Sequence, residues 1–211
     1  MTKNLCLLAG MITLLWTSAL SSPASAVTLE STFDAGLEGW TGSTGGDLAF
    51  VSTGGNPGGF LQQTDTDLSD MFVTAPASFL GDKSAFLNGT LSFDARQVGG
   101  NAEKYAAFGF VTLFNGGNAI SADIAGANAP SNDWTTFSVN LNAVGFETTP
   151  EAVAAVLSNV TMIMVTLESQ IGVAETTGMD NFRMVSVPEP ATLGIAGLGL
   201  CGVGLLRRKR G

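Results

Sequence analysis

Carboxylates are the side chains of this 211-residue chain that could most readily take part in catalysis or metal binding. Histidine is absent, and the two cysteines, Cys6 and Cys201, lie in the apolar segments at the two ends. A serine or cysteine nucleophile normally needs histidine as its general base, so catalysis of that kind is not expected. Three roles remain for the acids: binding calcium, cleaving glycans as a carboxylate pair, or solvating the surface.

Acids near the two ends of the central region suggest a metal site. Glu30 and Asp34 lie near its start and Asp180 near its end. Calcium takes several oxygen ligands, and one structural calcium ion held by these three residues is our hypothesis. The alternative is that Asp180 only ends a turn before the last strand. Residues 65–70 alternate acids but lack the glycine and distal glutamate of an EF-hand loop, so we expect a solvated loop there.

The charge of the central region limits the classes of molecule that the protein could bind. Between Val27 and Val187 only four residues are basic, and all acids except Glu189 lie there, which gives a net charge of −13. Such a field repels nucleic acid and anionic lipid, since both are polyanions. Nucleic-acid binding is excluded, and cations or neutral polymers are favoured.

The N-terminus has the pattern of a signal peptide. Lys3 precedes an apolar run over residues 5–20, and small residues at Ala24 and Ala26 fit a cleavage site before Val27. Residues 1–26 are therefore predicted to be removed on export. The alternative is an N-terminal membrane anchor.

The C-terminus has three consecutive parts. Pro188, Glu189 and Pro190 precede an apolar stretch over residues 191–206, and a basic cluster follows, formed by Arg207, Arg208, Lys209 and Arg210. The stretch would span about 24 Å as a helix, which is short against a hydrocarbon core of about 30 Å. We predict a transmembrane helix whose basic end stays cytoplasmic.

This tripartite tail, over residues 187–211, resembles the PEP-CTERM sorting signal of Gram-negative bacteria. The resemblance implies that an exosortase recognises the Pro-Glu-Pro motif and processes the tail. It also implies a place at the cell surface, outer membrane or extracellular matrix, in association with exopolysaccharide. A plain stop-transfer anchor is the alternative.

The middle domain, residues 27–186, has the pattern of a β-sandwich. Short apolar runs alternate with polar residues and are separated by turns rich in Gly, Asn and Pro. The expected strands cover residues 89–94, 105–114, 137–141, 160–167 and 181–185. The Gly-rich residues 42–59 are expected to form a mobile loop. One helix is expected from Thr149 to Leu157, with Thr149 as its cap and Pro150 in its first turn.

Segments over most of residues 33–182 resemble the laminin B domain (laminin domain IV). The sharpest match is the Pro-x-x-Phe-Leu-Gly-Asp-Lys string of residues 76–83. The resemblance implies an all-β, jelly-roll-like sandwich in an extracellular setting. Two features depart from the family: Val73-Thr74 replaces the usual aromatic residue, and no cysteine-rich repeats flank the domain.

The sequence favours a non-enzymatic surface protein that binds or accompanies exopolysaccharide. The alternative is a secreted glycan-active enzyme with a carboxylate pair. An exposed cleft holding such a pair would favour the enzyme, and a sheet face with exposed aromatic side chains would favour the binding protein. The residues expected in the core are Trp40, Phe79, Leu80, Leu91, Phe93, Trp134, Ile163, Val165 and Phe182.

Overall fold

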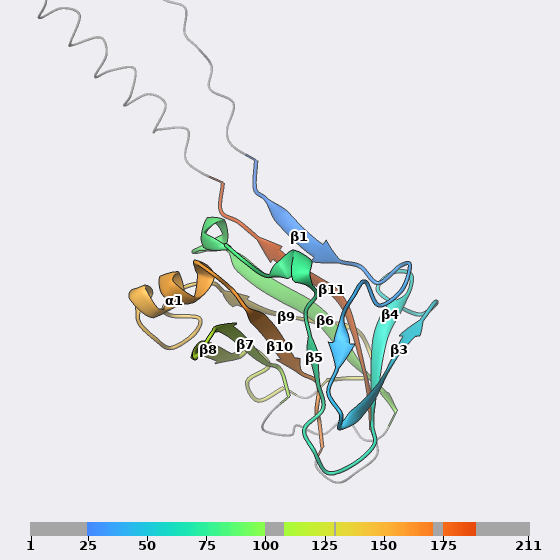
Figure 1. Cartoon of the computed structure of the whole chain (residues 1–211). Helices are drawn as coiled ribbons and strands as arrows, with labels where there is room; N and C mark the ends of the chain where they lie inside the picture. The colour runs from blue at the N-terminus through green and yellow to red at the C-terminus, as the bar shows by residue number, and fades with distance from the viewer. Residues whose placement is uncertain (1–24, 100–107, 129, 171–174, 189–211) are drawn as a thin grey trace, which may run out of the picture. The chain divides into compact units, whose positions relative to one another are not determined.

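Two antiparallel sheets lie face to face in the computed structural model, which describes residues 25–99, 108–128, 130–170 and 175–188 (Figure 1). The described elements all belong to one compact unit, Ser25–Pro188. Residues 1–24 of the predicted signal peptide and the whole predicted transmembrane helix lie outside the described residues. Within the described part of the chain, no helix has the length and apolar character needed to cross a membrane.

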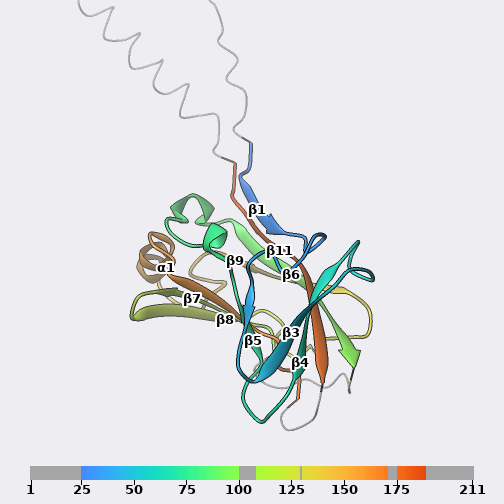
Figure 2. The same ribbon diagram turned by 45° about the vertical axis from the view of Figure 1, so that its right-hand side comes forward.

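The larger sheet has the strand order β3-β4-β11-β6-β9, and β1 pairs with the second half of β11. Figures 1 and 2 both show β1 and β11 side by side, so the first strand lies against the last. The strands of this six-stranded sheet are β1 (Thr28–Ser31), β3 (Gly46–Val51), β4 (Phe60–Asp65), β6 (Thr90–Gly99), β9 (Thr135–Asn140) and β11 (Thr176–Val185).

The smaller sheet has the strand order β2-β5-β10-β7-β8. Its strands are β2 (Thr41–Gly42), β5 (Phe72–Thr74), β7 (Phe110–Asn115), β8 (Asn118–Asp123) and β10 (Met162–Thr166). A tight hairpin joins β7 to β8, where Asn115 pairs with Asn118. Two 3-10 turns, Ala77–Phe79 and Ser84–Phe86, follow β5.

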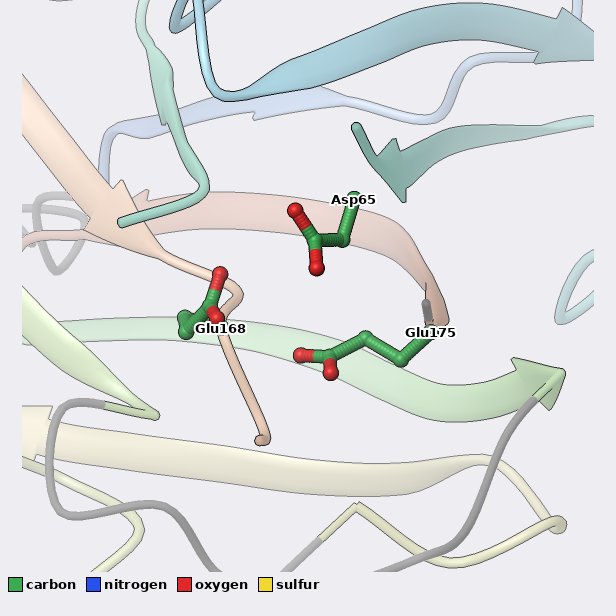
Figure 3. Close-up of side chains that lie close together, drawn as sticks. All are labelled: Asp65, Glu168 and Glu175. Atoms are coloured by element: carbon green, nitrogen blue, oxygen red, sulfur yellow. The ribbon is translucent and has the colours of Figure 1, made fainter. Parts of the chain in front are cut away.

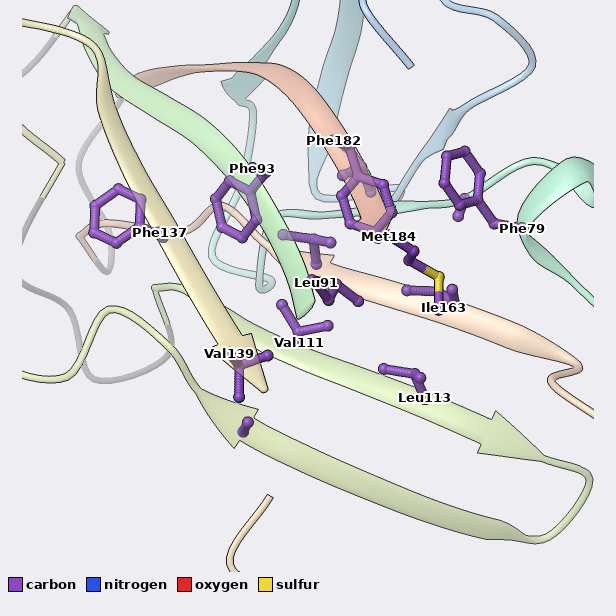
Figure 4. Packing of buried hydrophobic residues seen from close by; sticks show 14 of the residues in the cluster. Phe79, Leu91, Phe93, Val111, Leu113, Phe137, Val139, Ile163, Phe182 and Met184 are labelled. Atoms are coloured by element: carbon purple, nitrogen blue, oxygen red, sulfur yellow. The ribbon is translucent and has the colours of Figure 1, made fainter. Parts of the chain in front are cut away.

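The core fills the space between the sheets, because alternate residues of each strand point to opposite faces. Figure 4 shows this packing, with Leu91 and Phe93 of β6 facing Val111 and Leu113 of β7. All four side chains are fully buried. An aromatic cluster closes one part of the core, where the rings of Trp40 and Phe79 lie 4.8 Å and 5.0 Å from that of Phe182. Burial of this apolar surface is the main source of the domain's stability.

The helix α1 (Pro150–Leu157) begins where the sequence predicts it. Thr149 is extended, and its side chain accepts a hydrogen bond from the backbone N–H of Ala152 at 3.2 Å. Pro150 occupies the first turn and Glu151 stands near the positive helix end. Val153, Val156 and Leu157 are buried, so the helix packs its apolar face on the sandwich.

The sandwich with one short helix confirms the predicted fold class, and three local expectations are corrected. Residues 42–59 are not one mobile loop, since β3 lies within them. Trp134 is partly exposed on the outer face of the larger sheet and is not a core residue. Leu80 is only partly buried at the margin of the core. The other seven predicted core residues are buried.

Candidate functional site

Asp180, predicted as a metal ligand, lies at a β-bulge in β11 and is fully buried. The bulge places Asn181 in the left-handed region, with φ 49°. Asp180 Oδ2 accepts a hydrogen bond from the backbone N–H of Asn56 at 2.6 Å, and its Oδ1 accepts one from the N–H of Asn181 at 2.7 Å. The carboxylate therefore fixes the loop of residues 52–59 to the outer face of the larger sheet.

Asp94 of β6 joins this network from the neighbouring strand. Its Oδ2 accepts from the side-chain amides of Asn56 and Asn181, at 3.0 Å and 2.8 Å. Its Oδ1 accepts from the Thr136 hydroxyl at 2.6 Å. Burial raises the pKa of Asp180; its two backbone hydrogen bonds oppose this rise, while the negative charges of Asp94 and Asp34 add to it.

The other two residues of the predicted calcium set are exposed. Asp34 follows β1 and lies against the loop, because a Cβ on Gly58 would stand 1.9 Å from its Oδ1. Glu30 lies on β1 opposite Arg183. Among the described residues, these two acids and Asp180 do not form a trio close enough to share an ion. A calcium ion at this place stays a prediction.

Trp134 occupies the same outer face, beside the loop. Its ring packs edge-on against Phe60 at 5.4 Å, and the Arg96 guanidinium lies 5.0 Å from its centroid. Its indole N–H donates to the Gly54 carbonyl at 3.0 Å. Gly178 leaves room for this stack, since a Cβ there would meet Phe60 at 3.0 Å. This region of the larger sheet is therefore covered by the chain's own loop.

The outer face of the smaller sheet has a different character. Val111 and Leu113 point inward, so alternation places Phe110, Thr112 and Phe114 on the outer side of β7. All three are partly exposed. Alternation and strand register bring neighbours from β5, β8 and β10 to the same face: Phe72, Thr74, Ala119, Ser121, Asp123, Met162, Met164 and Thr166.

Aromatic rings and hydroxyl groups alternate on this face, which we call the aromatic sheet face. Phe114 stands between Met162 of β10 and Ala119 of β8. In the next row Thr112 stands beside Ser121, and their hydroxyl oxygens lie 2.8 Å apart. The face combines apolar rings for stacking with hydroxyl groups for hydrogen bonds. A sugar ring has the complementary features, an apolar face and a rim of hydroxyl groups.

A third cluster, of three carboxylates, is buried between the sheets. Asp65 ends β4, Glu168 follows β10 and Glu175 immediately precedes β11. Their carboxylates point toward one another in Figure 3, and one oxygen from each lies within 4.8 Å of the other two. The three side chains are at most 8% exposed. The expected solvated loop at residues 65–70 is thus wrong for Asp65, though right for the exposed residues after it.

These three acids and the aromatic sheet face were not found from the sequence. Asp65 shares the inward side of β4 with Leu61 and Gln63, and this alternation was the one available signal. The pairing of β11 with β4 brings Glu175 to Asp65, and the facing of the two sheets adds Glu168, which follows β10; local patterns reveal neither. Of the sorting motif, Pro188 is described and exposed, while Glu189 and Pro190 lie outside the described residues, as do the basic cluster and its helix.

The fold and these surfaces define a β-sandwich module of two antiparallel sheets. Residues 72–195 match the family Laminin B (Domain IV), and residues 186–210 match the PEP-CTERM protein-sorting motif. The chain therefore belongs to the laminin B (domain IV) family and carries a PEP-CTERM sorting signal at its C-terminus. A comparison with curated proteins finds no match.

Solved structures with the same fold include several carbohydrate-binding modules. A xylan-binding domain of family 22 is 14% identical with a TM-score of 0.52, covering 77% of this chain and 95% of that one. A family 11 module from Clostridium thermocellum, solved with a mixed-linked tetrasaccharide, is 17% identical with a TM-score of 0.50, covering 80% and 100%. An agarase is 18% identical with a TM-score of 0.55 over 78% of this chain, which spans only 25% of that enzyme. At these identities the likeness shows the fold alone.

Proposed function

We propose that the chain is an exosortase-sorted surface protein of a Gram-negative bacterium that binds a neutral polysaccharide without cleaving it. The aromatic sheet face carries this proposal, because it presents partly exposed rings beside hydroxyl groups on a regular sheet. Pyranose rings have apolar faces that stack on aromatic side chains and hydroxyl rims that need hydrogen-bond partners.

The spacing of the rings favours a chain of sugars over a single sugar. Phe110 and Phe114 are four residues apart on β7, which is roughly 13 Å at about 3.3 Å per residue. Phe72 lies on β5, two strands away across β10. A ligand that contacts all three rings must extend across the sheet, as an oligosaccharide segment can.

Charge favours a neutral polymer. The central region carries a net charge of −13, and the exposed Asp123 lies at the margin of the face. An anionic polysaccharide would be repelled at low ionic strength, whereas a neutral one would not. The sorting signal supports the place of action, since it directs export and processing at the cell envelope, where exopolysaccharide accumulates.

Carboxylate geometry supports binding over catalysis. A glycosidase places its acid and its nucleophile or base about 5–10 Å apart on either side of an open cleft. The compact carboxylate trio described above is buried between the sheets. The aromatic sheet face carries a single acid, Asp123, among its described residues.

A glycan array probed with residues 25–188 tests the proposal, followed by titration calorimetry with the glycan that binds best. We expect a neutral oligosaccharide to bind, and Phe110→Ala or Phe114→Ala to lower its affinity at least tenfold, about 1.4 kcal/mol. Both rings are partly exposed, so the variants should keep the fold.

Val144→Ala is the matched control, because this side chain is 86% exposed and lies in the β9–α1 connection, away from the face. Its affinity should equal that of the wild type. The proposal fails if no neutral glycan binds, if the Phe variants bind as the wild type does, or if the bound glycan is hydrolysed.

A further inference from the structure

Three carboxylates lie close together (Figure 3), and all three side chains are buried. Burying ionised carboxylates together is costly, because each loses hydration and repels the others. Burial raises the pKa of Glu168 to about 7, and Glu175, Asp65 and Asp70 contribute by repulsion. No described lysine or arginine contributes to the electrostatics of Glu168 or Glu175. The fold therefore assembles negative charge here without a neighbouring cationic side chain among the described residues.

Glu175 supplies an independent sign of a missing partner. Its Oε1 accepts hydrogen bonds from the backbone N–H groups of Ser169 and Gln170 and from the Ser169 hydroxyl. Its Oε2 has no hydrogen-bond partner among the described residues, although Glu175 is only 1% exposed. These donors hold the Glu175 carboxylate in one orientation, in which it faces Asp65 and Glu168 (Figure 3). Among the described residues, its second oxygen stays without a donor. A buried, unpaired carboxylate oxygen is expensive unless a ligand satisfies it.

The separations fit one cation in particular. Calcium binds oxygen at about 2.3–2.6 Å, and the three ligand atoms lie within 4.8 Å of one another. Oxygens at this separation stand close to the spacing that three ligands of one calcium ion adopt, so small side-chain movements bring all three to the ion. Magnesium binds at about 2.0–2.1 Å and keeps several waters, which suits a buried trio of this width less well. The chain contains no histidine, and the trio offers oxygen alone, the ligand that calcium prefers.

We propose that Asp65, Glu168 and Glu175 bind one Ca²⁺ that joins the two sheets. Asp65 ends β4 and Glu175 immediately precedes β11, the strand that pairs with β4 in the larger sheet. The Asp65 N–H donates to the Glu175 carbonyl at 2.9 Å. Glu168 follows β10 of the smaller sheet, and its Oε2 accepts from the Met71 N–H at 2.9 Å, next to β5. The ion links the β4–β11 pair of the larger sheet to the segment after β10 of the smaller sheet.

This site is distinct from the predicted set at Glu30, Asp34 and Asp180, which lies on the outer face of the larger sheet. It is also independent of the polysaccharide proposal, since the trio is buried and the aromatic sheet face is not. Bound calcium stabilises the native state by linkage, because the unfolded chain does not hold the three carboxylates together.

Thermal unfolding and calorimetric titration of residues 25–188 with Ca²⁺ after chelator treatment test this proposal. We expect one Ca²⁺ per chain and a higher unfolding midpoint, with magnesium at equal ionic strength giving a much smaller shift. Glu175→Gln and Asp65→Asn should each lower calcium affinity at least tenfold. Glu147→Gln is the matched control, as an exposed acid outside the cluster, and should bind calcium like the wild type.

A crystal grown with calcium gives a readout that does not depend on variants. An anomalous peak between the three carboxylates supports the site. The proposal is overturned by a peak at Asp180 alone, by equal effects of calcium and magnesium, which indicate general screening, or by unchanged calcium affinity in folded Glu175→Gln. None of these results bears on glycan binding, which is measured with the Phe110 and Phe114 variants.

Discussion

Phe93 lies at the centre of the contact between the sheets. It is fully buried on β6, and its ring centroid is 5.8 Å from that of Phe137 on the neighbouring strand. Figure 4 shows both rings on the inner side of the larger sheet. Removing this ring leaves a cavity that surrounding strands cannot fill without breaking their pairing.

Phe93→Ala should therefore lower the free energy of unfolding by about 3–5 kcal/mol, measured by urea denaturation of residues 25–188. Val144→Ala, on an exposed side chain, should change it by less than about 0.5 kcal/mol. A loss below about 1 kcal/mol for Phe93→Ala would mean that the ring faces solvent and the register of β6 is wrong.

Glu168 should make the calcium-free protein sensitive to pH. Because its folded pKa, about 7, lies above the ordinary value of 4.5, the folded state binds a proton that the unfolded chain releases. The resulting stability is complete below about pH 4.5 and is lost as the pH rises through about 7.

In chelator, the free energy of unfolding of the wild type should fall between pH 5 and pH 8. The pKa values of Glu175 and Asp180 are also raised, so the Glu168 contribution is isolated by comparison with Glu168→Gln. The variant should lose less stability over this range. Equal pH slopes for the two proteins would contradict the prediction.

Individual residues differ in how far the sequence reveals their role. Trp40 and Trp134 look alike in the sequence, yet Trp40 is buried with its indole N–H on Ser31, while Trp134 stacks on Arg96 outside the sheet. Whether Trp134 is buried depends on which side of β9 faces the core, because Trp134 stands just before that strand. Asp65 likewise looked solvated because acids alternate along residues 65–70, yet only the residues after Asp65 are exposed.

At the scale of elements, α1 shows local signals acting as predicted. Its start depends on the Thr149 side chain, which satisfies one of the backbone N–H groups that a helix leaves unpaired. Thr149→Ala should lower the free energy of unfolding by about 1 kcal/mol, measured by denaturation at neutral pH. Thr148→Ala is the control and should be nearly neutral, because among the described residues it is the Thr149 side chain that caps the helix. Equal effects of the two changes would refute the capping role.

Strands were harder to predict where their extent depends on pairing with neighbouring strands and not on their own composition. Only residues 181–185 of β11 looked strand-like, because Gly178 and Asp180 resemble turn residues. The structure extends β11 from Thr176 to Val185, since its first half pairs with both β4 and β6. Gly178 fits there because Phe60 and Trp134 occupy the space above it. The strand β3 was missed for the same reason, as glycines surround it.

At the scale of the molecule, the C-terminal sorting motif and the fold class could be predicted from the sequence, and the aromatic sheet face could not. Apolar length, terminal charge and the Pro-Glu-Pro motif are local features that need no tertiary structure. The aromatic sheet face is assembled from four strands between residues 72 and 166, so its residues become neighbours only through the register of β5, β7, β8 and β10.

Processing at both ends is the prediction that follows from the terminal signals. The mature protein should start at Val27 and lose its apolar tail near Pro188–Pro190. Intact-mass analysis of protein recovered from the cell surface should show both cuts. Recovery of surface-exposed chain that retains the cluster from Arg207 to Arg210 would contradict it.

The most direct test of the central claim is to map a bound oligosaccharide on the folded domain. Isotope-labelled residues 25–188 are titrated with the neutral oligosaccharide that the array selects, and amide and aromatic resonances are followed by NMR. The account predicts that the shifted signals belong to Phe72, Phe110, Thr112, Phe114 and Ser121, on the aromatic sheet face. Shifts centred on Trp134 and Arg96, or a saturating ligand that leaves the five signals unchanged, would contradict it.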